Sequence, residues 1–347
     1  MLRKGKGKLI YVVAAACWLL IAIATLSHGS ASSPQVWHEA LARLRGHTTD
    51  WNPLFDERLP RLIVLLCTGA SLAVSGVVMQ SIFRNPLASP MVLGLTSGGS
   101  LLVLFTFLLE WHLSFPFSVP LAAFIGCLLA LLTVYNSARQ WGEVNMTRLI
   151  LAGIALSTVL VAIQGAALYA FRDHWSLVQT FSEWEAGSTT YRSWSHVHLQ
   201  LPVTLVGLFG CWTYRNEINI LTLGDEEALS LGVEVSKVRW RLFLCICLLT
   251  GGALAAMGVI AFFGLVLPHM LRSKFGPDHR NLIPLCILIG SPTLALLDLL
   301  LRALSLHQLS IGNVSAILGG IFFLALLLRT HQPQQVSTHR QFAMGHQ

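Results

Sequence analysis

The sequence predicts an all-α integral membrane protein with ten transmembrane helices, and three observations lead to this fold class. Of the 347 residues, 54% are hydrophobic and only 11% are charged, whereas soluble domains are typically about 25% charged. Apolar runs recur along the chain, most of them close to the roughly 20 residues that a helix needs to cross a bilayer. A ten-residue stretch of the first half also matches one in the second half, which suggests an internal repeat.

The apolar runs define the expected helices in order. They cover residues 9–26, 59–83, 91–109, 117–135, 149–171, 199–212, 242–263, 264–271, 282–301 and 314–328. The first run follows a basic leader but is longer than the apolar core of a secretory signal, which has about 7–15 residues, so we expect it to remain as a helix. The seventh and eighth runs share only the 30 residues between Arg241 and Arg272. One of the two must therefore be short or broken, with its exposed backbone covered by protein.

The distribution of basic residues predicts the orientation. If the N-terminus is cytoplasmic and the chain crosses ten times, sixteen of the 23 Lys and Arg residues fall on the cytoplasmic side. The seven on the outer side are Arg43, Arg45, Arg58, Arg61, Arg172, Arg192 and Arg302. This excess follows the positive-inside rule and places both termini in the cytoplasm. The net charge of +7 is then a property of topology, and we do not expect a nucleic-acid partner.

The internal repeat pairs residues 69–78 with residues 251–260. Five positions are identical, and the same offset places Pro86 on Pro268. Five crossings separate the copies, so they would enter the membrane from opposite sides and relate helices 2–5 to helices 7–10 as an inverted repeat, as in many transporters. The alternative is that small residues at helical spacing only allow helices to approach closely.

Catalytic and metal-binding patterns are absent from the sequence. It contains no GxxxxGK[ST] phosphate loop, no HExxH and no GxSxG, so we expect neither ATP hydrolysis by this chain nor any other enzyme activity. The seven cysteines are odd in number and form no CxxC pair, which favours packing roles over a metal site. Asp298 is the only acid well inside an apolar run, one helical turn before Arg302, with which it can pair. The lack of paired acids within the helices argues against a secondary transporter driven by protons.

The longest polar segment between apolar runs, residues 213–241, falls on the cytoplasmic side. Within it, Asp225, Glu226 and Glu227 precede apolar residues and Gly232 follows, a pattern that predicts a short capped helix. This helix is either a solvated surface element or a docking element for a cytoplasmic ATPase. The residues expected to take part in such coupling are Leu223, Gly224, Asp225, Glu226, Ala228, Leu229, Leu231 and Gly232.

Several segments together resemble the FecCD family of binding-protein-dependent permeases. The matching residues include Arg58-Leu-Pro-Arg61, Gly69-Ala-Ser-Leu-Ala-Val-Ser-Gly76, Arg84-Asn-Pro-Leu-Ala88, Arg148-Leu-Ile-Leu-Ala-Gly153, Trp184 with Gly187-Ser188, Leu223-Gly224, Phe263-Gly-Leu-Val-Leu-Pro-His269, and Asp298 with Arg302. The resemblance runs in order from Arg58 to Arg329. It departs from the family pattern at Leu309-Ser-Ile-Gly312, where the family usually has a proline after the leucine.

The resemblance implies a single permease domain over residues 1–347 with a flexible cytoplasmic tail at 330–347, in the bacterial inner membrane. The implied partners are a second permease subunit, two ATPase subunits that bind ATP and Mg, and a periplasmic substrate-binding protein. The family match places the docking of the binding protein on Arg58, Arg61 and Arg302 at an exposed outer rim, and the cytoplasmic gate on Asn145, Met146 and Thr147. The expected cargo is a ferric siderophore, and cobalamin or haem is the alternative.

Overall fold

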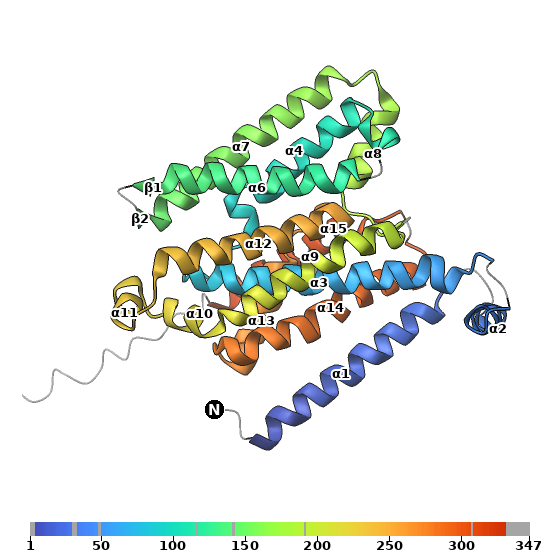
Figure 1. The fold of residues 1–347 in the computed structure, drawn as a ribbon, viewed down its shortest axis with the longest axis horizontal. Helices are drawn as coiled ribbons and strands as arrows, with labels where there is room; N and C mark the ends of the chain where they lie inside the picture. Colours follow the sequence, from blue (N-terminus) through green and yellow to red (C-terminus); the bar gives the residue numbers. More distant parts are fainter. Residues whose placement is uncertain are drawn as a thin grey trace, which may run out of the picture.

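The chain forms a bundle of helices that run roughly along one direction (Figure 1). We describe it from a computed structural model, in residues 4–29, 33–47, 50–115, 117–140, 143–190, 192–306 and 308–330. The helices are α1 (Lys4–Ser27), α2 (Ser33–Leu44), the π-helical turn η1 (Leu54–Arg58), α3 (Leu59–Ile82), the 3-10 turn η2 (Pro90–Leu93), α4 (Leu95–Leu108), α5 (Trp111–Ser114), α6 (Ser118–Ala138), α7 (Met146–Ala170), α8 (Trp175–Glu185), α9 (Trp194–Thr213), α10 (Arg215–Leu221), α11 (Asp225–Ser230), α12 (Val235–Met257), α13 (Phe263–Phe275), α14 (His279–Ala303) and α15 (Ile311–Thr330). Two antiparallel strands of two residues each, β1 (Arg139–Gln140) and β2 (Glu143–Val144), form a hairpin that precedes α7.

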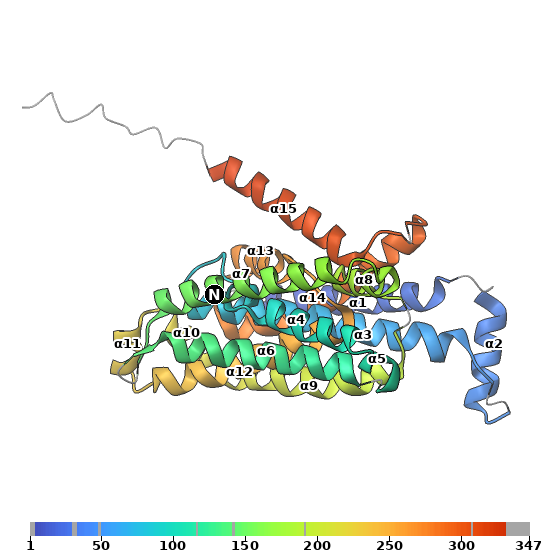
Figure 2. The same cartoon turned by 90° about the horizontal axis from the view of Figure 1, so that it is seen from above.

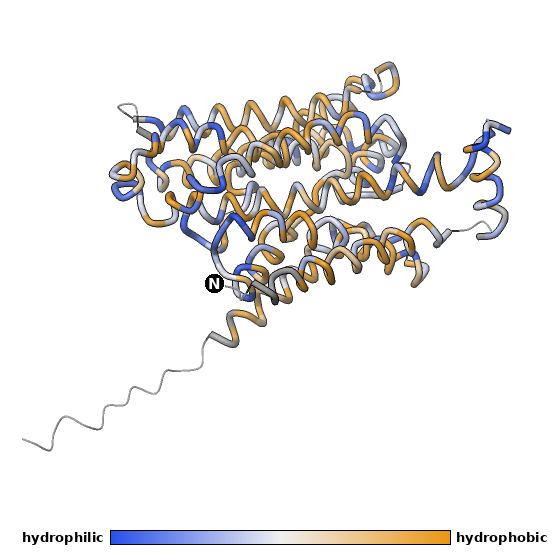
Figure 3. The backbone as a smooth tube through the Cα atoms, turned by 60° about the horizontal axis from the view of Figure 1, so that its bottom comes forward, coloured by the Kyte–Doolittle hydropathy of each residue, from blue (hydrophilic) through white to orange (hydrophobic). Residues whose placement is uncertain are grey.

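The two ends of the bundle carry different elements. One end holds α10, α11 and the β1–β2 hairpin, and the other holds α2, α5 and the start of α3 (Figures 1 and 2). We call them the α11 end and the α2 end. Hydrophobic residues dominate the helices between them, and hydrophilic stretches gather toward the ends (Figure 3). This distribution is the one expected of helices that cross a bilayer and leave their polar connections in water.

Six helices are long and apolar enough to cross a membrane. They are 9–27 of α1, η1 with α3, α6, α7, α12 and α14. Two shorter apolar helices cover 95–108 and 311–326. Each of the ten apolar runs of the sequence overlaps a helix, which confirms the all-helical membrane class. The count of ten crossings stays a prediction, and the tail beyond Thr330 lies outside the described residues.

The seventh and eighth apolar runs form one long and one short helix, as the limited spacing required. α12 ends at Met257, and α13 has 13 residues after a break at 258–262. Gly258 and Phe262 have positive φ values of 78° and 62°. The end of α8 and the segment after it pack on this break, since Val259 N donates to Glu185 O at 3.3 Å and Ser188 N donates to Met257 O, directly before the break, at 3.0 Å. Irregular backbone in a membrane bundle requires such protein cover.

The central helix of the bundle is α3, which is buried along most of its length. It packs against α13 and α14 of the second half, whereas α12 packs against α4 and α6 of the first half. Gly69 lies against the backbone of Gly290 on α14, and Gly76 against that of Gly264 on α13. Glycines at such contacts let helix backbones approach closely. In contrast, α15 leans away from the bundle (Figure 2).

The two copies of the ten-residue repeat differ in local structure. Residues 69–78 lie wholly inside α3, whereas residues 251–260 run past the end of α12 at Met257. Pro86 lies in the loop after α3, but Pro268 lies inside α13. The matched residues thus lie in different backbone settings, and close helix approach explains the glycines of α3. α3 of the first half packs on helices of the second half, and α12 of the second half packs on helices of the first half. This packing agrees with an inverted repeat of whole helices, which stays a prediction.

Candidate functional sites at the two ends of the bundle

The predicted helix in the polar segment is α11. It begins after Gly224, whose φ of 146° and close approach to Glu227 suit glycine, and it ends before Gly232 with φ of 79°. Ala228 is buried, whereas the side chains of Leu223, Leu229 and Leu231 are 61%, 60% and 60% exposed. Three exposed leucines on one short segment leave an apolar surface beside polar groups, which is typical of a protein contact. We call these three residues the leucine patch.

Asp225 fixes α11 to the bundle. Its carboxylate accepts hydrogen bonds from Nη1 and Nη2 of Arg239 on α12 at 2.7 and 2.5 Å, and Arg84 lies 3.8 Å from it. These hydrogen bonds from Arg239 hold the pKa of Asp225 below its ordinary value. Of the two acids proposed for coupling, Asp225 is thus paired with Arg239 of the same chain, whereas Glu226 is exposed. The helix is confirmed, and its docking role stays a prediction.

The predicted gate residues open α7 at the α11 end. Asn145 is the N-cap, and its Oδ1 accepts a hydrogen bond from Arg148 N at 3.0 Å. Met146 is half-buried, and Asn145 and Thr147 are exposed. The β1–β2 hairpin directly before them fixes the direction in which the chain enters α7. The structure places these residues at an exposed helix start, and their gate role stays a prediction.

At the α2 end, two of the three predicted docking arginines, Arg61 and Arg302, flank Asp298, which is 2% exposed, and Arg58 lies near Arg302. Arg61 Nη2 donates to Asp298 Oδ1 at 2.7 Å, and Arg302 Nε donates to Asp298 Oδ2 at 2.9 Å. Thr189 Oγ1 donates to Asp298 Oδ1 at 2.7 Å. The pairing of Asp298 with Arg302 was predicted and is confirmed. The participation of Arg61 and Thr189 was not predicted.

The expectation that these arginines form an exposed rim is wrong. Arg58 is 5% exposed, and the side chains of Arg61 and Arg302 are 16% and 13% exposed. Arg58 Nη1 donates to Leu26 O at 2.9 Å, and Arg302 Nη1 donates to His28 O at 3.0 Å. The guanidinium groups therefore connect the end of α1 to α3 and α14. The cluster carries three positive charges against one negative charge, so it remains electropositive although its members are mostly buried.

Sequence reasoning missed an acidic side chain, Glu185, at the end of α8. Its Oε1 accepts hydrogen bonds from Ser100 Oγ on α4 and Gln164 Nε2 on α7, both at 2.6 Å. Residues 172–193 read as a polar connection, so Glu185 was not counted among the acids inside the bundle. The signal was present, because Leu177, Phe181 and Trp184 recur at helical spacing and predict a buried face. Phe181 and Trp184 are indeed buried.

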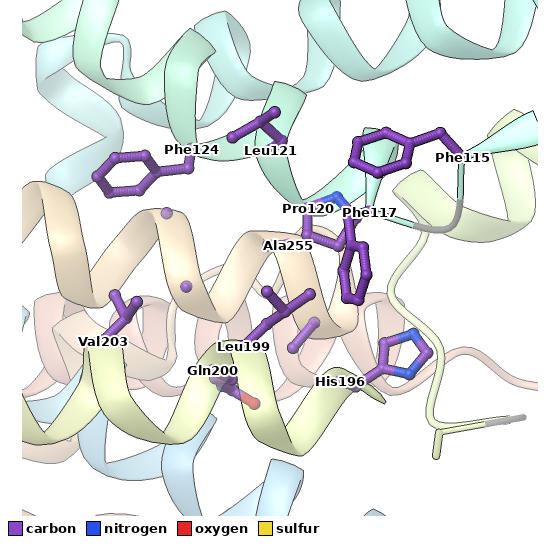
Figure 4. A pocket seen from close by; sticks show the side chains of 13 residues that line it. Phe115, Phe117, Pro120, Leu121, Phe124, His196, Leu199, Gln200, Val203 and Ala255 are labelled. Carbon is purple, nitrogen blue, oxygen red and sulfur yellow. The ribbon is translucent and has the colours of Figure 1, made fainter. Parts of the chain in front are cut away.

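An apolar hollow of about 330 Å³ lies between α6, α9 and α12. Its walls are mostly aromatic and aliphatic, including Phe117, Leu121 and Leu199, and its polar lining residues are His196 and Gln200 (Figure 4). Gln200 Nε2 donates to Thr68 Oγ1 at 2.7 Å and is therefore already engaged. The hollow lacks a pair of groups for acid–base chemistry. Among the described residues, no three His, Cys, Asp or Glu side chains are grouped to hold a metal ion.

The apolar helices, the broken pair α12–α13 and the polar elements at both ends define a multi-helix membrane transport protein. A family model described as the FecCD transport family matches residues 15–329. The chain belongs to this family.

Similar proteins include three permeases of known systems. The hemin transport system permease protein HmuU of Yersinia pestis is 37% identical, over 91% of this chain and 95% of that protein. The vitamin B12 import system permease protein BtuC of Vibrio vulnificus is 39% identical, over 80% of this chain and 83% of that protein. The Fe(3+) dicitrate transport system permease protein FecD of Escherichia coli is 36% identical, over 85% of this chain and 91% of that protein. A solved inward-facing structure of a metal-chelate type ABC transporter is similar with a TM-score of 0.80 and 26% identity, over 93% of this chain and 99% of that one.

Proposed function

We propose that this chain is the permease subunit of a binding-protein-dependent ABC importer that moves a ferric siderophore through the bacterial inner membrane, with both termini cytoplasmic. The observation that carries the proposal is the exposed leucine patch on α11, in a chain of the FecCD transport family. A permease that has no phosphate loop needs a separate ATPase, which would bind ATP and Mg, and the patch offers a surface for it. Cobalamin and haem are alternative cargoes, because relatives are named for vitamin B12 and hemin.

A second permease subunit would complete the transport pathway. Two helices support this part of the proposal, because α7 and α15 expose many apolar side chains. On α15 these include Ile317, Ile321, Leu324 and Leu328. Lipid and a partner helix can both cover such a surface. We propose that part of it faces the second subunit and that Asn145, Met146 and Thr147 of both subunits meet at the cytoplasmic gate.

The α2 end would receive the periplasmic binding protein. The electropositive cluster around Asp298 supports this proposal, because complementary charge accelerates encounter between proteins. Since Arg58, Arg61 and Arg302 are mostly buried, we propose that they act through their electric field and by holding the end of α1 and His28 in place. Direct contacts with the binding protein would then be made by other residues of this end.

Reconstitution tests the proposed function. The permease, its ATPase and its binding protein are assembled in proteoliposomes, and uptake of ferrioxamine B, haemin and cyanocobalamin is measured with and without ATP. Uptake that requires ATP and the binding protein, and that persists with an uncoupler, supports the importer. Uptake that an uncoupler abolishes and ATP does not affect would support a secondary transporter instead.

The leucine patch gives the first prediction. Replacing Leu229 by Asp would bury a charge in the proposed ATPase interface at a cost of roughly several kcal/mol. We expect ATPase copurification to fall at least ten-fold, while the permease keeps its thermal stability because Leu229 is exposed in the free chain. Leu44→Asp, at a leucine of α2 that is also exposed but lies at the opposite end, is the control, and the ATPase should copurify normally with it. Equal copurification of both variants would refute the docking role.

The gate gives the second prediction. Thr147→Cys, introduced together with Cys17→Ser because Cys17 is exposed, should form a disulfide between two permease subunits in at least one nucleotide state. The exposed position of Thr147 at the start of α7 allows such an approach. The measurement is non-reducing electrophoresis after oxidation without nucleotide, with ATP and with ADP. The protein with Cys17→Ser alone should migrate as a monomer on the gel in all three conditions. Absence of a disulfide-linked dimer of the Thr147→Cys protein in every nucleotide state would place the gate elsewhere.

A further inference from the structure

Glu185 is a half-buried acid that contacts α4 and α7 inside the bundle. Its partner Gln164 is six residues before the end of α7, roughly 9 Å along the helix at 1.5 Å per residue. Its other partner, Ser100, is buried within α4. An ionisable side chain at such depth is costly in a membrane and usually serves transport or binding.

Three irregular or helix-terminal segments meet at Glu185. α8 ends there, the break at 258–262 crosses it with Val259 N donating to Glu185 O at 3.3 Å, and α15 begins at Ile311. Gly312 packs so closely on the carbonyl oxygens of Ala186 and Val259 that only glycine fits. The start of α15 thus lies beside the end of α8 (Figure 2). In membrane transporters, discontinuous helices of this kind form substrate sites.

A polar hollow of about 360 Å³ opens at this junction. Ser182, Glu185 and Asn313 line it together with the backbone of the break and of α15. Among the described residues, the two hydrogen bonds that the side-chain carboxylate of Glu185 accepts both go to Oε1, so Oε2 remains for a group in the hollow. Within the described part of the chain, no Lys or Arg forms an ion pair with Glu185. The start of α15 supplies the partial positive charge of a helix N-terminus, which eases the burial of a carboxylate without neutralising it.

We propose that Glu185 is a specificity-determining residue of the transport pathway, which binds a cationic or hydrogen-bond-donating group of the chelate and disfavours anionic chelates. This inference rests on the proposed function and narrows its cargo. A carboxylate with a free oxygen accepts strong hydrogen bonds from ammonium, amide and hydroxyl groups. It repels carboxylate-rich cargo in the low-dielectric surroundings of the bundle. Cationic hydroxamate chelates and amide-rich cobalamins therefore suit the hollow, and ferric dicitrate or haemin does not.

The test uses the complete transporter in proteoliposomes with four probes: ferrioxamine B, cyanocobalamin, ferric dicitrate and haemin. Glu185→Gln removes the charge but keeps an oxygen that can accept from Ser100 and Gln164, so it should fold normally. Glu185→Lys reverses the charge. Glu183→Gln, an exposed position of α8 whose side chain accepts a hydrogen bond only from Gln179 among the described residues, is the matched control.

We expect the wild type to import a cationic or amide-rich probe. Glu185→Gln should reduce its initial rate at least ten-fold and Glu185→Lys should abolish it, while Glu183→Gln imports normally. Copurification of the ATPase and the binding protein with Glu185→Gln, at the yield of Glu183→Gln, shows that the variant transporter is assembled.

Two results would overturn the inference: wild-type import restricted to ferric dicitrate or haemin, or unchanged import of a cationic or amide-rich probe by Glu185→Gln and Glu185→Lys. Failure of the wild type to import any probe with ATP would instead overturn the proposed function, on which the inference rests. The two kinds of failure are distinguishable, because failure of the proposed function appears with the wild type, before any substitution is made.

Discussion

Gly76→Ala is expected to prevent correct assembly of the bundle or to destabilise it by about 3 kcal/mol or more, at the upper end of the cost of overpacking a core. A Cβ at Gly76 would overlap the backbone carbonyl of Gly264 on α13. Backbone cannot swing aside as a flexible side chain can, so α3 and α13 would have to move apart. Because α3 is the central helix, this separation would also disturb its packing on α14. Thermal denaturation of the detergent-purified permease measures the loss.

Gly165→Ala is the control for this substitution. Gly165 also lies inside a long helix, α7, but a Cβ there meets no atom within 4 Å. Alanine has the higher helix propensity, so this variant should be as stable as the wild type or slightly more stable. Equal stability of Gly76→Ala and Gly165→Ala would contradict the close α3–α13 approach.

Hydropathy and local signals predicted much of the architecture. The ten apolar runs coincide with helices because a bilayer selects continuous apolar segments regardless of tertiary context. Acids at its start and a glycine after it identified α11, because these features act within a few residues. The limited spacing between Arg241 and Arg272 predicted the broken pair α12–α13 from chain length alone.

The sites depended on contacts between distant segments, which one sequence does not reveal. Glu185 sits in a segment that looks like a polar loop, and only the fold brings Ser100 and Gln164 to it. The charge count and the family match favoured a rim of Arg58, Arg61 and Arg302. The structure instead pairs Arg61 and Arg302 with Asp298, and Arg58 with the carbonyl oxygen of Leu26. The matched glycines also have different settings, since Gly69 and Gly76 are contact points of α3, whereas Gly258 ends α12.

Asp298→Asn is expected to lower the stability of the permease by about 3 kcal/mol, the size of effect found when one partner of a buried ion pair is removed. The amide can still accept a hydrogen bond but no longer balances Arg61 and Arg302, whose side chains are 16% and 13% exposed. Thermal denaturation in detergent measures the change. Glu234→Gln, which breaks the exposed pair with Lys237, is the control and should leave the midpoint unchanged, because exposed pairs contribute little. An equal midpoint for both variants would show that Asp298 does not hold the α2 end together.

The same variant separates the structural role of the cluster from docking. Without the negative charge of Asp298, the field of the three arginines grows, so a binding protein with an acidic face should associate faster than with the wild type at low salt. The difference should fade above about 0.1 M salt, where the screening length is about 10 Å. Association is measured well below the denaturation midpoint, so that the variant remains folded. A rate equal to that of the wild type at every salt concentration would refute the docking proposal and leave Arg58, Arg61 and Arg302 as residues that join α1, α3 and α14.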